Sequence, residues 1–162
     1  MIKIRVFDKA DWPAVQDIYQ QGIDTKNATF QSKAKTWEEW NDSALKVCRL
    51  VATDVTEVVG WAALSAVSGR AVYAGVAEVS IYVALARQGR GIGKQLLAAL
   101  VDASEQAGFW TLQATIFPEN RASVSVHESC GFKTVGLREK LGQMDGVWRD
   151  VVLMERRSKV VG

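Results

Sequence analysis

The stretch VSIYVALARQGRGIGKQLL, from Val79 to Leu97, decides the fold. Its first part is rich in β-branched and aromatic residues and predicts a strand, and its last part predicts an apolar helix. Between them, Gln88 to Gly93 spaces three glycines, so that successive backbone N–H groups can point into one concavity. The helix that follows aims its unpaired N–H groups and dipole at the same place, which predicts a phosphate or pyrophosphate site.

Two common phosphate-binding loops do not fit this turn. The glycines fall as G-x-G-x-G, whereas a dinucleotide-binding turn needs G-x-G-x-x-G. No Gly-Lys-Ser/Thr follows, as a nucleoside triphosphatase loop requires. From these residues alone, a flexible connection with incidental glycines stays open as the alternative.

Length and composition indicate one globular domain over residues 1–162, because 48% of the residues are hydrophobic and 23% are charged. A net charge of +2, with no basic cluster beyond Arg156-Arg157, gives no indication of a nucleic-acid partner. Cys48 and Cys130 are too few for a metal site and are expected to be reduced, buried thiols. The N-terminus does not resemble a signal peptide and no apolar run could span a membrane, so we expect a cytoplasmic protein without a membrane partner.

Hydrophobic periodicity and capping signals predict the other elements. Asp11 is expected to cap a first helix, Thr36 with Glu39 to open a second that runs to about Lys46, and Asn120 to cap a short last one. Strands are predicted over residues 2–6, 47–52, 58–67, 72–83, 110–116, 132–141 and 147–154, the last two as a hairpin around Asp145-Gly146. The order is strand, two helices, three strands, helix, strand, helix and two strands, which predicts an α+β or α/β three-layer domain around a mixed sheet.

The Gln88-x-x-Gly91-x-Gly93 turn, between a strand and a helix, resembles the coenzyme A pyrophosphate loop of the GNAT superfamily of N-acetyltransferases. Other segments look like the phosphinothricin and methionine sulfoximine N-acetyltransferases within it: residues 28–30, 70 with 73, 78–83, 118–120, 127–132 and 148–151. The resemblance covers nearly the whole chain. It implies the GNAT fold, a central mixed and mostly antiparallel sheet flanked by helices. It also implies direct transfer of an acetyl group from acetyl coenzyme A to a primary amine, with no metal.

The chemistry needs a base, because the amine arrives mostly as ammonium and must lose a proton. Glu78 is the candidate, because it is the carboxylate in an otherwise apolar and aromatic strand. The resemblance also places the family's proposed base at this position. The alternative is that Glu78 is an ordinary solvent-exposed residue of the strand. His127 stands four residues before Gly131, where most GNAT proteins have a tyrosine. It is a candidate acid for the leaving thiolate or, equally, a structural histidine.

The resemblance assigns the cofactor to two groups of residues. Backbone groups of Ile81, Tyr82 and Val83, at an expected β-bulge, would polarise the thioester carbonyl and hold the pantetheine arm. Asn120 matches a pantetheine-binding position but is also explained as a helix cap. The full cofactor set is Ile81, Tyr82, Val83, Gln88, Gly89, Arg90, Gly91, Ile92, Gly93, Asn120 and Ser123.

For the acceptor, the resemblance implies a carboxylate-binding Arg70 beside Ser68, which replaces the basic residue often found there. Phe30, Tyr73 and Trp148 could wall the pocket, which gives a substrate set of Phe30, Ser68, Arg70, Tyr73, Glu78 and Trp148. Family members commonly form homodimers through their last strands, so a two-fold dimer is expected. Three functions stay open: an amino-acid N-acetyltransferase, a GNAT enzyme for protein N-termini, lysines or another small amine, and a non-catalytic sensor of acetyl coenzyme A.

Overall fold

The structure is a computed structural model that describes residues 1–162. Seven strands form one sheet in the order β1-β2-β3-β4-β5-β7-β6, and only the β4–β5 pair is parallel. The strands are β1 (Ile2–Val6), β2 (Leu50–Asp54), β3 (Glu57–Ala66), β4 (Val76–Val83), β5 (Thr111–Ile116), β6 (Lys133–Met144) and β7 (Val147–Arg157). The helices are α1 (Trp12–Asp24), α2 (Trp37–Ser43), α3 (Ile92–Gln106) and α4 (Arg121–Ser129). This confirms the predicted α+β fold and the predicted element order.

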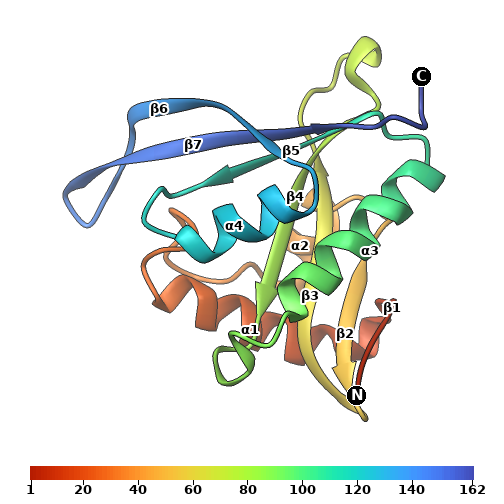
Figure 1. Cartoon of the computed structure of the whole chain (residues 1–162). Coiled ribbons are helices and arrows are strands. Elements are labelled where there is room, and N and C mark those ends of the chain that lie inside the picture. The colour runs from red at the N-terminus through yellow and green to blue at the C-terminus, as the bar shows by residue number, and fades with distance from the viewer.

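Helices cover both faces of the sheet (Figure 1). On one face, the apolar stripe of α3 packs against β2 to β5 through buried Ile92, Leu96 and Leu100. On the other face, α1 and α2 enclose a second cluster with Tyr19, Trp40 and Trp61. Because side chains alternate along a strand, β4 contributes Val79 to the first cluster and turns Tyr82 toward the second.

The parallel pairing of β4 with β5 is short. It joins Val76–Glu78 to Thr111–Gln113 and ends there, so the two strands diverge beyond Glu78. Figure 1 shows β5, β7 and β6 fanning away from β4, with α4 beside the opening. The expected β-bulge in β4 is wrong, because β3 and β4 pair in one unbroken register from Gly60–Val83 to Ala66–Ala77. The strand edge is opened by divergence of the sheet instead.

The end of α1 lies close against β4 at the opening. A Cβ atom at Gly22 would lie 2.5 Å from the ring of Tyr82, so this position has room only for a glycine. The close approach places the α1–α2 connection over the diverging strands.

Some predicted helix ends differ from the structure. Asp11 occupies the N-cap position of α1, but its side chain makes no capping bond. Both of its carboxylate oxygens instead accept from the Arg5 guanidinium at 2.8 Å, which lowers the pKa of Asp11. The predicted capping box of Thr36 and Glu39 is confirmed. The helix it opens ends at Ser43 rather than Lys46, where the buried Arg49 guanidinium binds the carbonyls of Asn41 and Ala44.

Two strands begin later than predicted. β2 starts at Leu50 rather than Val47, since Cys48 has a positive φ of 62°. β4 starts at Val76 rather than Val72, since Ala71–Tyr73 form a 3₁₀ turn. Cys48 and Cys130 are unpaired, as predicted, but half-buried rather than buried.

The C-terminal hairpin turns at Asp145-Gly146, as predicted, with φ values of 50° and 78°. Val151 points into the core, and β6 is an edge strand of the sheet. The exposed apolar surface of the hairpin comes from Val135, Leu137, Leu141, Val147 and Trp148. None of the helices is long and apolar enough to cross a membrane.

Candidate active site

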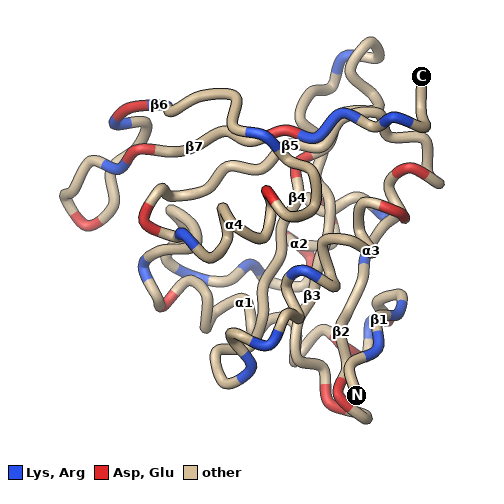
Figure 2. The backbone as a smooth tube through the Cα atoms, in the orientation of Figure 1, with Lys and Arg blue, Asp and Glu red and all other residues tan.

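The glycine turn has the geometry that an anion site requires. Gly89 and Gly91 both have a φ of 77°, a conformation that side chains disfavour. Gly91 is the N-cap of α3, and the first helical bond of this turn runs from Gln95 N to Gly91 O. The N–H groups of the first turn are therefore available to an anion. Figure 2 marks basic residues in blue along this connection between β4 and α3.

A cavity of about 290 Å³, here called the α4 cavity, leads from this turn along the open edge of β4. It is lined by seven of the predicted cofactor residues, Ile81, Tyr82, Val83, Gln88, Gly93, Asn120 and Ser123. Of the other four, Gly89, Arg90 and Gly91 lie exposed on the turn and Ile92 is buried in the core. Only backbone atoms of Ile92 could therefore meet a cofactor.

The edge of β4 beyond Glu78 is free to bind a ligand. Since β5 has diverged, residues 79–83 pair with β3 on one side and with no strand on the other. The Gln88 side chain donates to Val83 O at 3.0 Å and so ties the glycine turn to the end of this edge. An amide-bearing arm could add to such an edge as another strand would.

Two smaller cavities continue from the α4 cavity. The split cavity, about 140 Å³, lies between β4 and β5, and the aromatic cavity, about 200 Å³, lies between the sheet and the α1–α2 side. The split cavity shares Tyr82, Asn120 and His127 with the α4 cavity. It shares Thr29, Glu78, Ser80 and Tyr82 with the aromatic cavity.

Glu78 lies where the split and aromatic cavities meet. Its carboxylate accepts from Gln113 Nε2 at 2.8 Å and from Thr115 Oγ1 at 3.4 Å. No Lys or Arg lies within ion-pair distance of it. The two neutral donors fix both oxygens and leave the negative charge available to an incoming ammonium group.

His127 is buried, 5% exposed, and lines both the α4 and split cavities. Its Nδ1 lies 2.7 Å from the Ser123 carbonyl oxygen, which can only accept, so Nδ1 carries the proton. This also means that Nδ1 cannot act as a base for the nearby Ser123 hydroxyl. Burial lowers the pKa of His127, an effect that the Ser123 carbonyl opposes, so the ring is neutral at pH 7 with Nε2 unprotonated.

The α1–α2 connection is held over the cavities by polar contacts. Asn120 caps α4 by accepting from Ser123 N, as predicted, and its amide also donates to the Asn27 carbonyl at 3.3 Å. Arg149 on β7 donates to Lys26 O and to Asn27 Oδ1, both at 2.9 Å, and lies 3.9 Å from the Phe117 ring centre. The terminal hairpin therefore fixes the loop that lines the α4 cavity.

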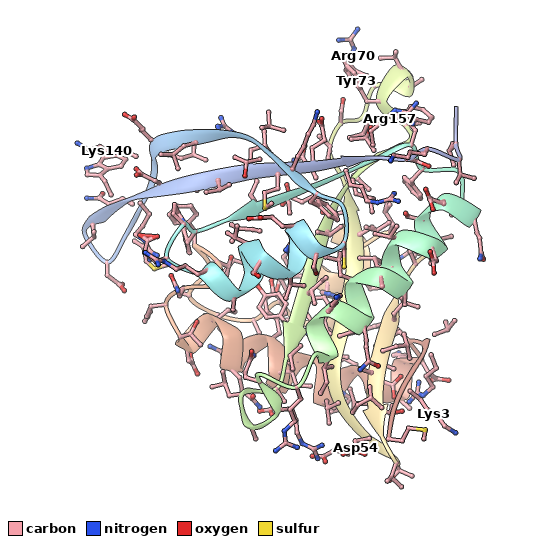
Figure 3. All side chains as sticks on the ribbon, viewed as in Figure 1. Lys3, Asp54, Arg70, Tyr73, Lys140 and Arg157 are labelled. Atoms are coloured by element: carbon pink, nitrogen blue, oxygen red, sulfur yellow. The ribbon has the colours of Figure 1, made fainter.

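Of the predicted acceptor-binding residues, Glu78 alone lines any of the three cavities. Arg70 lies 5.6 Å from the Tyr73 ring centre, and Figure 3 shows both at the end of the sheet near the C-terminus. Ser68 lies in the loop before them, and Trp148 is exposed on the hairpin. Phe30 packs edge-on against Phe117 at 4.9 Å, outside the cavities.

Several site residues were missed by the sequence interpretation. Gln113 and Thr115 could have been found, since they are the polar positions of an alternating strand whose partner carries Glu78. Gln31 and Lys35 gave no such signal, because a loop has no periodicity that places its side chains. Both of them line the aromatic cavity.

A ligand with a pyrophosphate and a narrow arm of amides would use the turn, the α4 cavity and the open strand edge at once. These features place the chain among the acyl-coenzyme A-dependent transferases. The match to the sequence model described as "Acetyltransferase (GNAT) family", over residues 12–132, shows that the chain belongs to that family. It is an acetyl-coenzyme A-dependent N-acetyltransferase.

Relatives with named substrates match nearly the full chain. The phosphinothricin N-acetyltransferase of Streptomyces viridochromogenes is 31% identical over 96% of this chain and 87% of its own. The L-methionine sulfoximine/L-methionine sulfone acetyltransferase of Salmonella typhimurium is 29% identical over 94% of this chain and 92% of its own. A phosphinothricin acetyltransferase from Sinorhizobium meliloti, solved in complex with acetyl coenzyme A, superposes with a TM-score of 0.86 at 29% identity, covering 96% and 88%.

Replacing Gly91 with valine is expected to weaken binding of acetyl coenzyme A by at least about tenfold, because a β-branched residue strains a backbone with positive φ and obstructs the N–H groups. Titration calorimetry measures this directly. Gly69→Ala is the matched control, since Gly69 has an ordinary φ and open space around it. Unchanged affinity in Gly91→Val would contradict the assignment of the turn.

Proposed function

We propose that the chain, acting as one domain, transfers the acetyl group of acetyl coenzyme A directly to the primary amine of a small amino-acid-like acceptor of the phosphinothricin or methionine sulfoximine type. The observation that supports this most strongly is the position of Glu78, which lines both the split cavity and the aromatic cavity. An amine bound in the aromatic cavity would meet the carboxylate on its way to a thioester held along β4. The substrate class is carried over from the named relatives.

Glu78 acts as the general base. The acceptor amine arrives mostly as ammonium, and Glu78 takes its proton while Gln113 and Thr115 hold the carboxylate in place. The neutral amine then attacks the thioester carbon. Backbone groups on the free edge of β4, at Ile81 to Val83, stabilise the negative charge that develops on the carbonyl oxygen.

The thiolate of coenzyme A is the leaving group, and we assign its protonation to His127. Because the pKa of His127 is lowered, only a small fraction of the enzyme carries an imidazolium at neutral pH. His127 therefore contributes less than Glu78, and protons from solvent can reach the thiolate as well. No cysteine lines the three cavities, which supports direct transfer over a thioester intermediate on the enzyme.

The aromatic cavity favours a small acceptor over a protein. It has a volume of about 200 Å³ and is walled by Tyr19, Trp40, Trp61 and Tyr82, which suits a small molecule, whereas a peptide substrate needs an extended groove. The presence of Glu78, with both oxygens held by hydrogen bonds, argues against a sensor without catalytic activity. We place the enzyme in the cytoplasm, with no nucleic-acid or membrane partner.

We also propose a two-fold homodimer through the terminal hairpin. β6 is an unpaired edge, and Val135, Leu137, Leu141, Val147 and Trp148 expose apolar surface on the same hairpin. A symmetric partner would cover this surface. Because Arg149 of the hairpin holds the loop over the cavities, dimer formation would also stabilise the site.

Glu78→Gln is expected to lower kcat by about 10²- to 10⁴-fold without changing the affinity for acetyl coenzyme A, because the amide keeps the shape but cannot take a proton. The loss should be largest at low pH, where more of the amine is protonated. A thiol-release assay across a pH series measures it. Glu128→Gln, on the exposed side of α4, is the matched control. Equal rates for Glu78→Gln and parent at every pH would remove Glu78 as the base.

Light scattering at micromolar concentration is expected to give twice the mass of the chain. Leu137→Glu should shift it to the monomer, because a charge would then lie in the apolar contact. Val72→Glu, which changes another exposed apolar residue away from the hairpin, should stay dimeric. A monomeric parent that is fully active would contradict the dimer proposal.

A further inference from the structure

The geometry points to an anion subsite in the aromatic cavity: we propose that the Lys35 ammonium binds the carboxylate of the acceptor, so that the enzyme selects amino acids over simple amines. This rests on the proposed function, because it takes the acceptor amine to lie at Glu78. It goes beyond that function by naming the residue that recognises the acceptor's second charged group.

The charges in the aromatic cavity match those of an amino acid. Lys35 and Glu78 are the only charged residues that line it, and they have opposite signs. They come from different elements, Lys35 from the loop before α2 and Glu78 from β4. An acceptor with an ammonium group at Glu78 and a carboxylate toward Lys35 complements both charges, whereas a simple amine leaves Lys35 unmatched.

The Lys35 ammonium is available to a ligand. Its one hydrogen bond goes to Ser43 Oγ, at 3.1 Å, and no carboxylate lies within ion-pair distance. Since an ammonium has three donors, two remain for a carboxylate. Ser43 also lines the cavity and adds a hydroxyl group beside the ammonium.

The position of Lys35 is fixed by its neighbours. The Lys35 carbonyl accepts from Gln16 Nε2 of α1 at 3.1 Å, and the next residue, Thr36, caps α2. The side chain therefore starts from a backbone held by two helices. A cation anchored in this way loses less conformational freedom when it binds than one on a free loop.

The walls of the cavity combine polar groups with aromatic rings. Gln31, Ser43, Ser65 and Ser80 supply polar groups, and Tyr19, Trp40, Trp61 and Tyr82 supply the rings. Its volume of about 200 Å³ is sufficient for a molecule of the size of a free amino acid. A cavity that is partly screened from water strengthens an ion pair relative to the open surface.

No other Lys or Arg side chain of this chain lines the aromatic cavity. Arg70, which was predicted to bind the carboxylate, lies over Tyr73 and lines none of the three cavities. Lys33, two residues before Lys35, is exposed and lines none of them either. Lys35 is thus the cation that an acceptor at Glu78 would meet.

The test compares L-methionine sulfone with 3-(methylsulfonyl)propan-1-amine, which is the same molecule without its carboxylate. The parent enzyme is expected to prefer the amino acid in kcat/KM. Lys35→Met should lower kcat/KM for the amino acid by about 10- to 100-fold, mainly through KM, and leave the simple amine within about twofold, so that the preference is lost. Lys35→Arg should restore much of the preference, and Lys33→Met should keep all of it.

A variant that was merely misfolded would lose activity on both acceptors, and the simple amine detects this. The assignment of Lys35 would be overturned if Lys35→Met kept the preference for the amino acid, or if the parent enzyme preferred the simple amine. Either result would leave the proposed acetyl transfer intact. A parent that acetylates neither these two nor any of a panel of L-amino acids and their decarboxylated amines would instead overturn the proposed function, and the subsite with it.

Discussion

The divergence of β4 from β5 after Glu78 is the feature on which the rest of the site depends. Three paired positions join the two halves of the sheet, and beyond them the hydrogen-bonding edge of β4 has no partner strand. An unpaired edge inside a fold is costly unless another group satisfies it. Here the edge lines the α4 and split cavities, so the same break in the sheet creates both the binding edge and the space beside it.

Both sides of the opening are fixed by specific contacts. α1 can approach β4 because Gly22 has no side chain to meet the Tyr82 ring, and burial beside Tyr19 raises the pKa of the Tyr82 phenol, which stays neutral. From the opposite side, Arg149 binds the backbone at Lys26 and the side chain of Asn27. Glu78 lies at the last paired position, where the sheet is still held together and its carboxylate can be placed accurately.

Much of the fold could be predicted from the sequence. The glycine turn, the capping box of Thr36 and Glu39, the cap at Asn120 and the Asp145-Gly146 turn are local features, set by residues within a few positions of each other. The errors arose where different elements of the structure meet. Asp11 is bound by Arg5 of β1, α2 ends where Arg49 binds its carbonyls, and the strand edge opens by divergence from β5 rather than by a bulge.

The same distinction applies to the site. The cofactor residues on the turn and on β4 follow one another in the chain, and most of them line one cavity. The acceptor side is assembled from α1, the α1–α2 loop, α2, β3 and β4, so no sequence pattern could show that Lys35 and Glu78 share a cavity. The position of Arg70 away from the cavities is likewise a matter of tertiary structure.

In the proposed mechanism, the acetyl group passes directly to an amine bound in the aromatic cavity, with no covalent intermediate on the enzyme. Initial rates measured while acetyl coenzyme A and L-methionine sulfone are both varied test this claim most directly. Direct transfer requires both substrates to be bound together, so double-reciprocal plots should intersect. Parallel lines, together with an acetylated enzyme trapped in the absence of the amine, would contradict the account.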